Sequence, residues 1–450
     1  MTYEEAVRYL LTLGRELASP QQARAAKFDL RNITVLAERL GHPQRAYPCV
    51  HIAGTNGKGS TAAMLDSIFR MAGLRTGLYT SPHLERINER IRLDGEEISN
   101  ADFTAAFTRV QEQIEVLLAS GALAAHPTYF ECLTAMAFDY FAQQQVDFAV
   151  FEVGMGGRLD ATNIVTPEVA VITQIDFDHE DFLGHSIAEI AAEKAGIIKP
   201  GSWVVSAAEH AEARAVIVRR ARELDARLVE VETAYRVEQI TTTETGSHAA
   251  ITSAHSAKRI ELEIALPGRF QVRNAATALA AARLLAERGF PIDDAAIQRG
   301  IAAARWPGRL ERLQERPTVY LDGTHNPAGA RELLAFWREH FRGQRIHLVY
   351  GAMRDKAVDE ITGLLFPHAA TVILTQPRQP RAISAELLAQ MTQHLAADVR
   401  FIPAPEEAME EALELAAPHD VVFVTGSLYL VGDLRRWWAM RRAAAASVRT

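Results

Sequence analysis

The chain has 450 residues, of which 48% are hydrophobic and 23% charged, a composition typical of globular proteins and long enough for two sizeable domains. Its 48 basic and 56 acidic residues leave a net charge of −8, which excludes a general nucleic-acid binder. Two cysteines are too few for a disulfide framework, and no run approaches the ~18 apolar residues of a membrane span. Because the N-terminal residues are acidic and amphipathic, unlike a signal peptide, we expect a cytoplasmic protein, and we expect a monomer that binds small molecules.

The first candidate functional segment follows a short N-terminal region in which two helices are predicted on either side of Ser19-Pro20. An apolar run, Val50–Ala53, leads into the glycine-rich stretch GTNGKGS of residues 54–60, and apolar residues at helical spacing continue to Gly73. A strand, a glycine-rich loop and a helix are the context of a phosphate-binding loop, because backbone N–H groups and the helix N-terminus hold anionic oxygens. The sequence therefore predicts a phosphate loop; an ordinary turn between strand and helix is the alternative.

Within this loop, Lys58 is expected to reach the outer phosphates of a bound nucleotide. The common spelling of such loops places Ser or Thr directly after the lysine, whereas Gly59 intervenes here. Either Ser60 or Thr61 is then expected to face the phosphates or a magnesium ion.

Polar residues also follow three further predicted strands. Ser81 comes after the strand 76–80 and is either a magnesium ligand or part of a Ser-Pro turn. Glu152 ends the buried strand 146–153, the position of a magnesium carboxylate in phosphate-loop enzymes. His179 follows the strand 169–175 among several acids and belongs either to a surface cluster or to a metal site. Lys194 lies near the end of the next helix, where it can be a helix C-terminal cation.

The order of elements predicts two α/β domains. Residues 234–266 alternate in polarity and predict antiparallel strands, followed by an alanine-rich helix of about fifteen residues. Residues 306–317 are the best linker. From residue 318 strands and helices alternate again, with strands expected at 319–321, 347–350, 371–374, 400–402 and 421–424. We therefore expect a P-loop-type ATPase domain with a parallel sheet and a small antiparallel sheet in residues 1–307, followed by a smaller, doubly wound Rossmann-like domain in residues 308–450.

Taken together, the motifs resemble one family. GTNGKGS, TSPHL, FEVGMGGRLDATN, DHEDFLG, AEKAGIIKPG, PGRL, DGTHNP and TGSLYLVG occur in the order found in the folylpolyglutamate synthases. That family includes dihydrofolate synthases and belongs to the Mur ligase superfamily. Each motif is modest alone, but their joint order is specific. DGTHNP has Gly-Thr where many members of the family carry Val-Ala or Gly-Ala, but Asp322, His325 and Asn326 stay in place.

The resemblance implies an ATP-dependent amide ligase that adds L-glutamate to folate, and also to 7,8-dihydropteroate, through an acyl phosphate. A carboxylate is a poor acylating agent, so the γ-phosphoryl group is transferred to it first. Such a transfer depends on positioning and charge neutralisation. Closure of the smaller domain over ATP would keep water away from the acyl phosphate.

The resemblance also implies roles for individual residues. It implies phosphate contacts for Gly54, Thr55, Asn56, Gly57, Lys58, Gly59, Ser60 and Thr61, and nucleotide contacts for Asn274, Arg309 and Asp322. It implies magnesium ligands at Ser81, Glu152, His179 and Lys194, with two Mg²⁺ ions and Lys194 carbamylated by CO₂. It implies substrate contacts for Phe28, Asp29, Leu30, Thr128, Tyr129, Phe130, Glu131, Leu159, Asp160, Ala161 and Ser427. Lys58, Lys194, Asp322 and His325 are the catalytic candidates, and His325 and Ser427 match positions near the incoming glutamate.

Two other functions compete with this one. A Mur-type peptidoglycan amino-acid ligase would use the same chemistry, but it would carry a nucleotide-sugar-binding domain for which about fifty preceding residues leave no room. A non-catalytic nucleotide switch would need a base-reading motif, for which Thr173–Asp176 is only a faint match, and it would leave DGTHNP unexplained. ATP turnover that requires both glutamate and a folate would separate the three.

Overall fold

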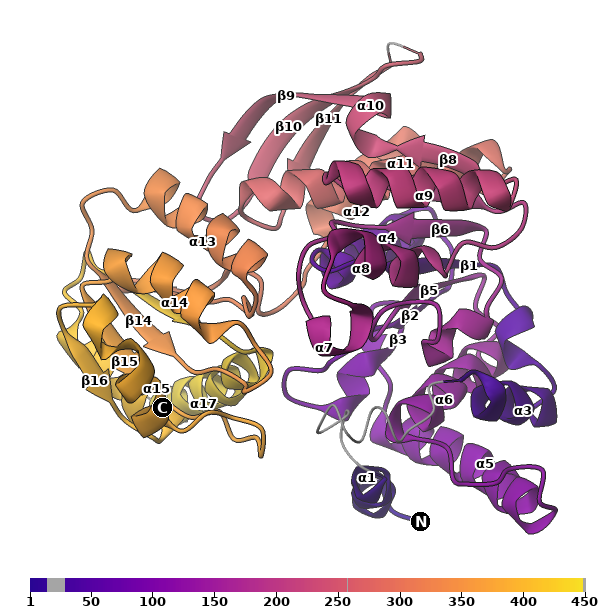
Figure 1. The fold of residues 1–450 in the computed structure, drawn as a ribbon, viewed down its shortest axis with the longest axis horizontal. Coiled ribbons are helices and arrows are strands. Elements are labelled where there is room, and N and C mark those ends of the chain that lie inside the picture. Colours follow the sequence, from indigo (N-terminus) through magenta and orange to yellow (C-terminus); the bar gives the residue numbers. More distant parts are fainter. Residues whose placement is uncertain (14–28, 257, 448–450) are drawn as a thin grey trace.

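The computed structural model describes residues 1–13, 29–256 and 258–447, which form a large and a small lobe (Figure 1). Within these residues, the large lobe contains an eight-stranded sheet of order β4-β3-β2-β5-β1-β6-β7-β8 and a three-stranded sheet of order β11-β10-β9. The small lobe contains a six-stranded sheet of order β12-β13-β17-β14-β15-β16. The predicted α/β class, with a small antiparallel sheet and a second α/β unit, is confirmed.

The eight-stranded sheet is mainly parallel. Its strands are β1 (Cys49–Ala53), β2 (Thr76–Tyr79), β3 (Ile91–Leu93), β4 (Glu96–Glu97), β5 (Phe148–Glu152), β6 (Val169–Ile172), β7 (Trp203–Ser206) and β8 (Arg227–Glu230). Its antiparallel pairs within the described residues are β2 with β3 and β3 with β4, at one edge. The central strands β1, β5 and β6 are buried throughout and mainly apolar, as is typical of strands covered on both faces. Because these strands run in one direction, the polar segments that follow them meet at one edge of the sheet.

Helices cover both faces of this sheet. One face packs against α4 (Lys58–Met71), α11 (Arg269–Glu287) and α12 (Asp294–Ala303) in a core that also includes the small antiparallel sheet. The other face packs against α1 (Tyr3–Thr12), α3 (Arg31–Arg39), α5 (Asn100–Ala119), α6 (Tyr129–Gln143), α7 (Glu180–Leu183), α8 (Ile187–Ala195) and α9 (Ala211–Glu223). The strands β9 (Tyr235–Thr242), β10 (Ser247–Ser253) and β11 (Arg259–Ile264) follow α10 (Val231–Ala234) at the top of Figure 1.

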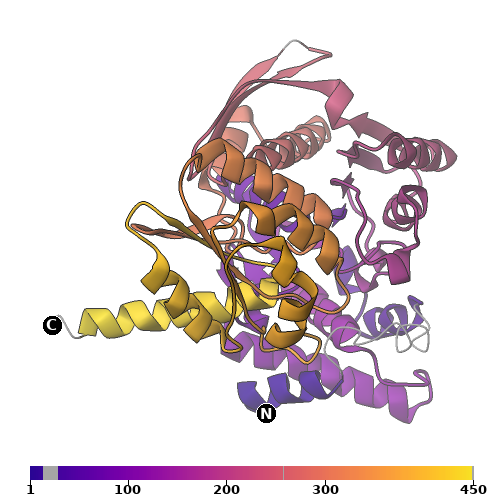
Figure 2. The same ribbon diagram turned by 60° about the vertical axis from the view of Figure 1, so that its left-hand side comes forward.

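The small lobe is doubly wound. Its strands are β12 (Glu311–Glu315), β13 (Thr318–Leu321), β14 (Ile346–Tyr350), β15 (Thr371–Leu374), β16 (Val399–Phe401) and β17 (Val421–Thr425). One face packs against α13 (Pro327–His340), α14 (Val358–Leu365) and α15 (Ala385–Thr392), and the other against α16 (Pro405–Leu415) and α17 (Leu428–Ser447). Figure 2 shows the end of α17 projecting beyond the lobe.

Several element predictions need correction. The expected linker 306–317 contains β12, which pairs antiparallel with β13 and so belongs to the second sheet. The alanine-rich helix α11 has 19 residues, more than the expected fifteen, because it continues to Glu287. Strand β8 and the edge strands β3 and β4 were not predicted. The break expected at Ser19-Pro20 lies outside the described residues.

Every helix in the described parts of the chain is too short or too polar to span a lipid bilayer.

Candidate active site between the two lobes

The loop between β1 and α4 has the backbone that its glycines require. Gly57 has a φ of 87°, and a Cβ there would lie 2.3 Å from Asn274 Oδ1. A Cβ on Gly54 would lie 1.8 Å from Thr173 Oγ1. A side chain at either position would collide with its neighbour, and at Gly57 it would also have to adopt the left-handed region that disfavours L-residues. The loop therefore lies tightly between β6 and α11, and the first turn of α4 presents N–H groups that have no acceptor within the helix.

Two lysine amines meet at this loop. Nζ of Lys58 donates to the carbonyls of Gly54 at 3.0 Å and Thr55 at 3.1 Å, and Nζ of Lys194 donates to the same Gly54 carbonyl at 2.8 Å. Burial lowers the pKa of Lys58. Burial, together with the nearby Lys58 ammonium, lowers the pKa of Lys194 to about 7. Near neutral pH a large fraction of Lys194 is therefore an uncharged amine.

The hydroxyls of α4 differ in their surroundings. Ser60 Oγ accepts from Gln271 Nε2 at 3.2 Å, and Gln271 Oε1 accepts from Asn274 Nδ2 at 2.9 Å. Thr61 Oγ1 is fully buried and has no hydrogen-bond partner among the described residues. Of the two hydroxyls left open by the sequence, Ser60 is thus linked to the Asn274 amide beside the phosphate loop.

The predicted magnesium ligands lie at the carboxyl edge of the large sheet. Glu152 ends β5, is 5% exposed, and its Oε2 accepts from the Ser81 N–H at 3.2 Å. Burial raises the pKa of Glu152, while the Lys58 ammonium opposes that shift. His179 stands at the start of α7 with a φ of 54°, and burial lowers its pKa to about 4, so its imidazole is neutral at pH 7.

These side chains fit magnesium in part. The described residues contain no cluster of three His, Cys, Asp or Glu side chains that could hold a metal ion. Magnesium needs few protein ligands because it keeps several waters, and the Ser81 hydroxyl and the Glu152 carboxylate are the oxygen donors that it prefers. Neutral His179 can donate a lone pair, whereas Lys194 would supply oxygens only as a carbamate.

The chain crosses to the small lobe at residues 308–310, and this crossing carries a charged pair. Asp322, at the end of β13, accepts from the Leu310 N–H at 2.9 Å and from the Thr324 N–H at 3.0 Å. Burial lowers the pKa of the Arg309 guanidinium, while Asp322 of the small lobe and Glu152 of the large lobe oppose that shift. Carboxylates of both lobes therefore act electrostatically on Arg309, whose Nη1 donates to the Gly308 carbonyl at 3.1 Å.

Asp178 joins the two lobes beside this pair. Its carboxylate accepts from Lys356 Nζ at 2.6 Å and from Asn326 Nδ2 at 3.1 Å, and lies 3.5 Å from His325 Nε2. Although burial acts in the opposite direction, Lys356 and the adjacent His179 hold the pKa of Asp178 well below its usual range. Asn326 also exchanges amide hydrogen bonds of 2.9 and 3.2 Å with Asn56 of the phosphate loop. The boundary between the lobes therefore includes the phosphate loop. We call this boundary the seam; it is formed by Asn56 and Asp178 of the large lobe and His325, Asn326 and Lys356 of the small lobe.

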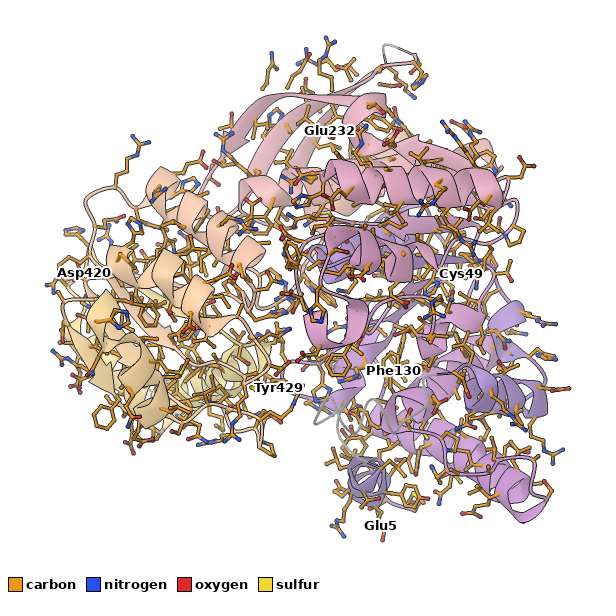
Figure 3. All side chains as sticks on the ribbon, in the orientation of Figure 1. Glu5, Cys49, Phe130, Glu232, Asp420 and Tyr429 are labelled. Carbon is orange, nitrogen blue, oxygen red and sulfur yellow. The ribbon has the colours of Figure 1, made fainter. Side chains whose placement is uncertain are left out.

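The expected glutamate contacts lie on the small-lobe side of the seam. His325 Nδ1 lies 2.7 Å from the Gly323 carbonyl, so its Nε2 is the ring nitrogen directed at Asp178. Ser427, just before α17, is 2% exposed, and its hydroxyl accepts from the Tyr429 N–H at 3.1 Å. Figure 3 labels Tyr429 on the small lobe near the boundary between the lobes.

The residues expected to contact the folate or dihydropteroate substrate, which accepts the glutamate, lie around the loop after β5. Thr128 and Glu131 form a reciprocal capping box at the start of α6, which fixes the aromatic residues Tyr129 and Phe130 between them. Phe130, labelled in Figure 3, covers Gly154, where a Cβ would lie 2.7 Å from its Cζ. Asp160 accepts from the N–H groups of Gly154 and Met155, both at 3.0 Å, so its carboxylate shapes this loop.

Five further residues are expected to contact the same substrate. Ala161 is buried and Leu159 partly exposed beside Asp160. Asp29 accepts from the Arg31 N–H at 2.9 Å and Leu30 precedes α3, whereas Phe28 lies outside the described residues.

Sequence reasoning missed Asp178, Asn326 and Lys356 as members of the site. Asp178 was noted only as a neighbour of His179, and Asn326 only as part of DGTHNP. Lys356 belongs to the segment 353–356 after β14, which the sequence places at a strand end where ligands bind in such sheets, but no role was assigned to it.

Comparison with known proteins agrees with this geometry. Residues 52–282 match the Mur ligase middle domain, and residues 308–428 match the Mur ligase glutamate ligase domain. These two matches assign both lobes to the class of the Mur ligases.

Full-length relatives narrow the class. The chain is 36% identical over 412 residues to the dihydrofolate synthase/folylpolyglutamate synthase of Bacillus subtilis, covering 91% of this chain and 95% of that protein. A Mycobacterium tuberculosis folylpolyglutamate synthase complexed with ADP superposes with a TM-score of 0.87 at 34% identity, covering 97% of this chain and 98% of that one. Escherichia coli FolC in complex with DHPP and ADP superposes with a TM-score of 0.85 at 31% identity, with the same coverage. The chain belongs to the folylpolyglutamate synthase/dihydrofolate synthase family.

Proposed function

We propose that this protein is an ATP-dependent ligase that adds L-glutamate to folate, and also to 7,8-dihydropteroate, through an acyl phosphate. The observation that carries the proposal is the seam between the lobes. There a glycine loop at a helix N-terminus exchanges amide hydrogen bonds with Asn326 of the other lobe, through Asn56. The names of the relatives, and the ADP bound in two related structures, support the same activity.

In this proposal the loop residues 54–61 hold the phosphates of ATP. Their backbone N–H groups and the N-terminus of α4 favour anionic oxygens. Lys58, whose amine now donates to carbonyls of its own loop, would turn to the γ-phosphoryl group and offset the charge that develops during transfer. Asn274, which touches Gly57, and the pair Arg309 and Asp322 would contact the nucleotide from the other side.

Ser81, Glu152 and His179 would hold Mg²⁺, and Lys194 a second ion after carbamylation. Bound magnesium supplies positive charge to the phosphate oxygens and to the developing acyl phosphate. In the carbamylation, the neutral Lys194 amine attacks CO₂, an N–C bond forms, and a proton leaves to solvent, so a cation becomes an anion. The lowered pKa of Lys194 supports this assignment, because the reacting amine must be uncharged.

The small lobe would bring the second substrate. His325 and Ser427 lie near the expected position of glutamate, whose amine attacks the acyl phosphate and releases phosphate. The aromatic residues Tyr129 and Phe130, with Thr128, Glu131, Leu159, Asp160 and Ala161, would line the pterin and benzoate, joined by the segment of Phe28, Asp29 and Leu30. With the lobes docked, water is excluded from the acyl phosphate, which would otherwise hydrolyse.

We further propose that residues 1–307 and 308–450 are the two functional units, and that the protein acts as a cytoplasmic monomer. The two cysteines are buried and unpaired thiols, which suits a reducing compartment.

One assay tests the activity. Pure protein is incubated with ATP, Mg²⁺ and L-glutamate, and with tetrahydrofolate, dihydropteroate or no acceptor, and ADP release and product mass are measured. We expect ADP release that requires both glutamate and an acceptor, with one glutamyl unit added per ADP. Turnover without a folate, or with a nucleotide-sugar-linked peptidoglycan precursor instead, would reject the proposal in favour of the alternatives.

A further inference from the structure

The segment that carries Ser81 forms a closed loop between β2 and β3. At its base the Thr80 N–H donates to the Arg90 carbonyl at 3.0 Å. Near its tip the Glu89 carboxylate accepts from the N–H groups of Leu84, Glu85 and Arg86, at 2.7, 2.8 and 2.8 Å. Three hydrogen bonds to one carboxylate hold residues 84–86 in a fixed turn, which we call the Leu84 turn.

The Leu84 turn belongs to the large lobe but docks on the small one. Leu84 packs against the core between β17 and α17. Its carbonyl oxygen comes so near to Gly432 of α17 that a Cβ there would lie 2.0 Å away. This approach to backbone, not to a flexible side chain, leaves no room for any residue larger than glycine.

Charged contacts add to this docking. Arg435 of α17 forms an ion pair with Glu85 of the turn and a second one with Glu311, at 3.0 Å. Arg436 Nη2 donates to the Glu85 carbonyl at 2.5 Å. The Glu85 side chain is 17% exposed and that of Arg435 is 35% exposed, so the pair is partly screened from solvent.

The other end of the same loop enters the candidate magnesium site. The Ser81 N–H donates to Glu152, and Ser81 is three residues from Leu84. Three residues of chain span at most about 11 Å, so a shift of the docked turn reaches Ser81 without a flexible spacer. The Ser81 hydroxyl makes no hydrogen bond to protein within the described residues, so its position depends on the backbone that carries it.

We propose that Leu84 and Glu85 are positioning residues that couple docking of the small lobe to the placement of the Ser81 hydroxyl in the magnesium site. This proposal rests on the proposed function. When α17 is docked, the turn is held and Ser81 lies next to Glu152. When α17 leaves, the turn loses its packing and its ion pair, and Ser81 is free to move. The small lobe thereby controls the metal site without contributing a ligand to it.

The test uses Gly432→Ala in the full-length protein. The added methyl collides with the Leu84 carbonyl, whereas alanine is the better helix former, so α17 itself is not weakened. The matched control is Gly363→Ala, because Gly363 lies in α14 of the same lobe and a Cβ there meets nothing within 4 Å. Glu85→Ala removes the ion pair while keeping the turn, and is the second test variant.

ADP affinity is measured by calorimetry with Mg²⁺ and with EDTA. We expect Gly432→Ala to lose on the order of five- to tenfold in affinity with Mg²⁺ and to match wild type in EDTA, the low end of typical coupling between sites. Glu85→Ala should show a smaller loss of the same kind, and Gly363→Ala none. Hydrogen–deuterium exchange of the peptide 81–90 should rise in Gly432→Ala, with an unchanged midpoint of thermal unfolding.

Three results would overturn the inference: no loss of ADP affinity in Gly432→Ala, an equal loss with and without Mg²⁺, or unchanged exchange in residues 81–90. Failure of the proposed function has a different signature, because wild-type protein would then show no ADP release that depends on glutamate and a folate.

Discussion

Replacing Asp178 with asparagine is expected to weaken the docking of the two lobes. Asp178 Oδ1 accepts from Lys356 Nζ at 2.6 Å, and the two side chains are 9% and 8% exposed. The substitution keeps the shape of the side chain but leaves the Lys356 ammonium buried without its counter-ion. Breaking a buried pair in this way costs roughly 3–5 kcal/mol. Because the asparagine amide oxygen can still accept a hydrogen bond from Lys356, we expect a cost at the low end of that range, about 3 kcal/mol.

A loss of about 3 kcal/mol shifts the equilibrium between docked and undocked lobes by about 150-fold. Small-angle X-ray scattering measures the result as a larger radius of gyration in the ligand-free variant. Asp176→Asn is the matched control, because Asp176 also bonds across the seam, to Arg331 Nη2 at 3.0 Å, but Arg331 is 53% exposed. Asp176 itself is 9% exposed, but the half-exposed Arg331 can turn to water when the pair is broken, so this control should expand less than Asp178→Asn. Equal expansion of both variants, or none in Asp178→Asn, would refute the role of the buried pair.

Further predictions concern the large lobe. Lys58→Ala should lower kcat by on the order of 10²-fold or more, because it removes charge stabilisation of the transferring phosphoryl group, and near-normal ATP turnover would refute that role. Lys194→Ala should abolish activity, and wild type should lose activity in CO₂-free buffer and regain it with bicarbonate; an active Lys194→Ala enzyme indifferent to bicarbonate would argue against the carbamate. Gly57→Ala should weaken ADP binding at unchanged fold, measured by calorimetry and circular dichroism, because its methyl would displace the Asn274 amide. Burial lowers the pKa of His51 to about 3, so between about pH 3 and pH 6.5 only the unfolded chain takes up this proton. The folded protein therefore becomes less stable as the pH is lowered through this range. His51→Gln should remove about 1.4 kcal/mol per pH unit of this slope in guanidinium unfolding, and equal slopes would contradict the assignment.

What the sequence could predict was local. The phosphate loop, the buried strand that ends in Glu152 and the alternation of the small lobe each show in a few consecutive residues, and all appear in the fold. Strand β12 was missed because its residues Glu311–Glu315 are mostly polar and only partly buried, as an edge strand allows. Whether a strand lies at the edge of a sheet depends on its neighbours in the fold, and the residues of the segment alone do not specify those neighbours.

Contacts across the seam could not be predicted in this way. Asp178 and Lys356 are 178 residues apart, and Gly432 meets a backbone carbonyl more than three hundred residues earlier. Such pairs depend on how two finished lobes pack, which no periodicity encodes. The roles assigned to individual residues stay predictions until the variants above are measured.

The crossing between the lobes is also a wall of the candidate site. Gly308 and Leu310 both have positive φ, of 70° and 46°, and Arg309 between them carries the guanidinium on which carboxylates of both lobes act electrostatically. One inserted residue would displace that guanidinium by about 3.3–3.6 Å. A chimaera that exchanges small lobes between related ligases must therefore be spliced upstream, at the end of α12, with the spacing from Arg309 to Asp322 inherited intact from one parent.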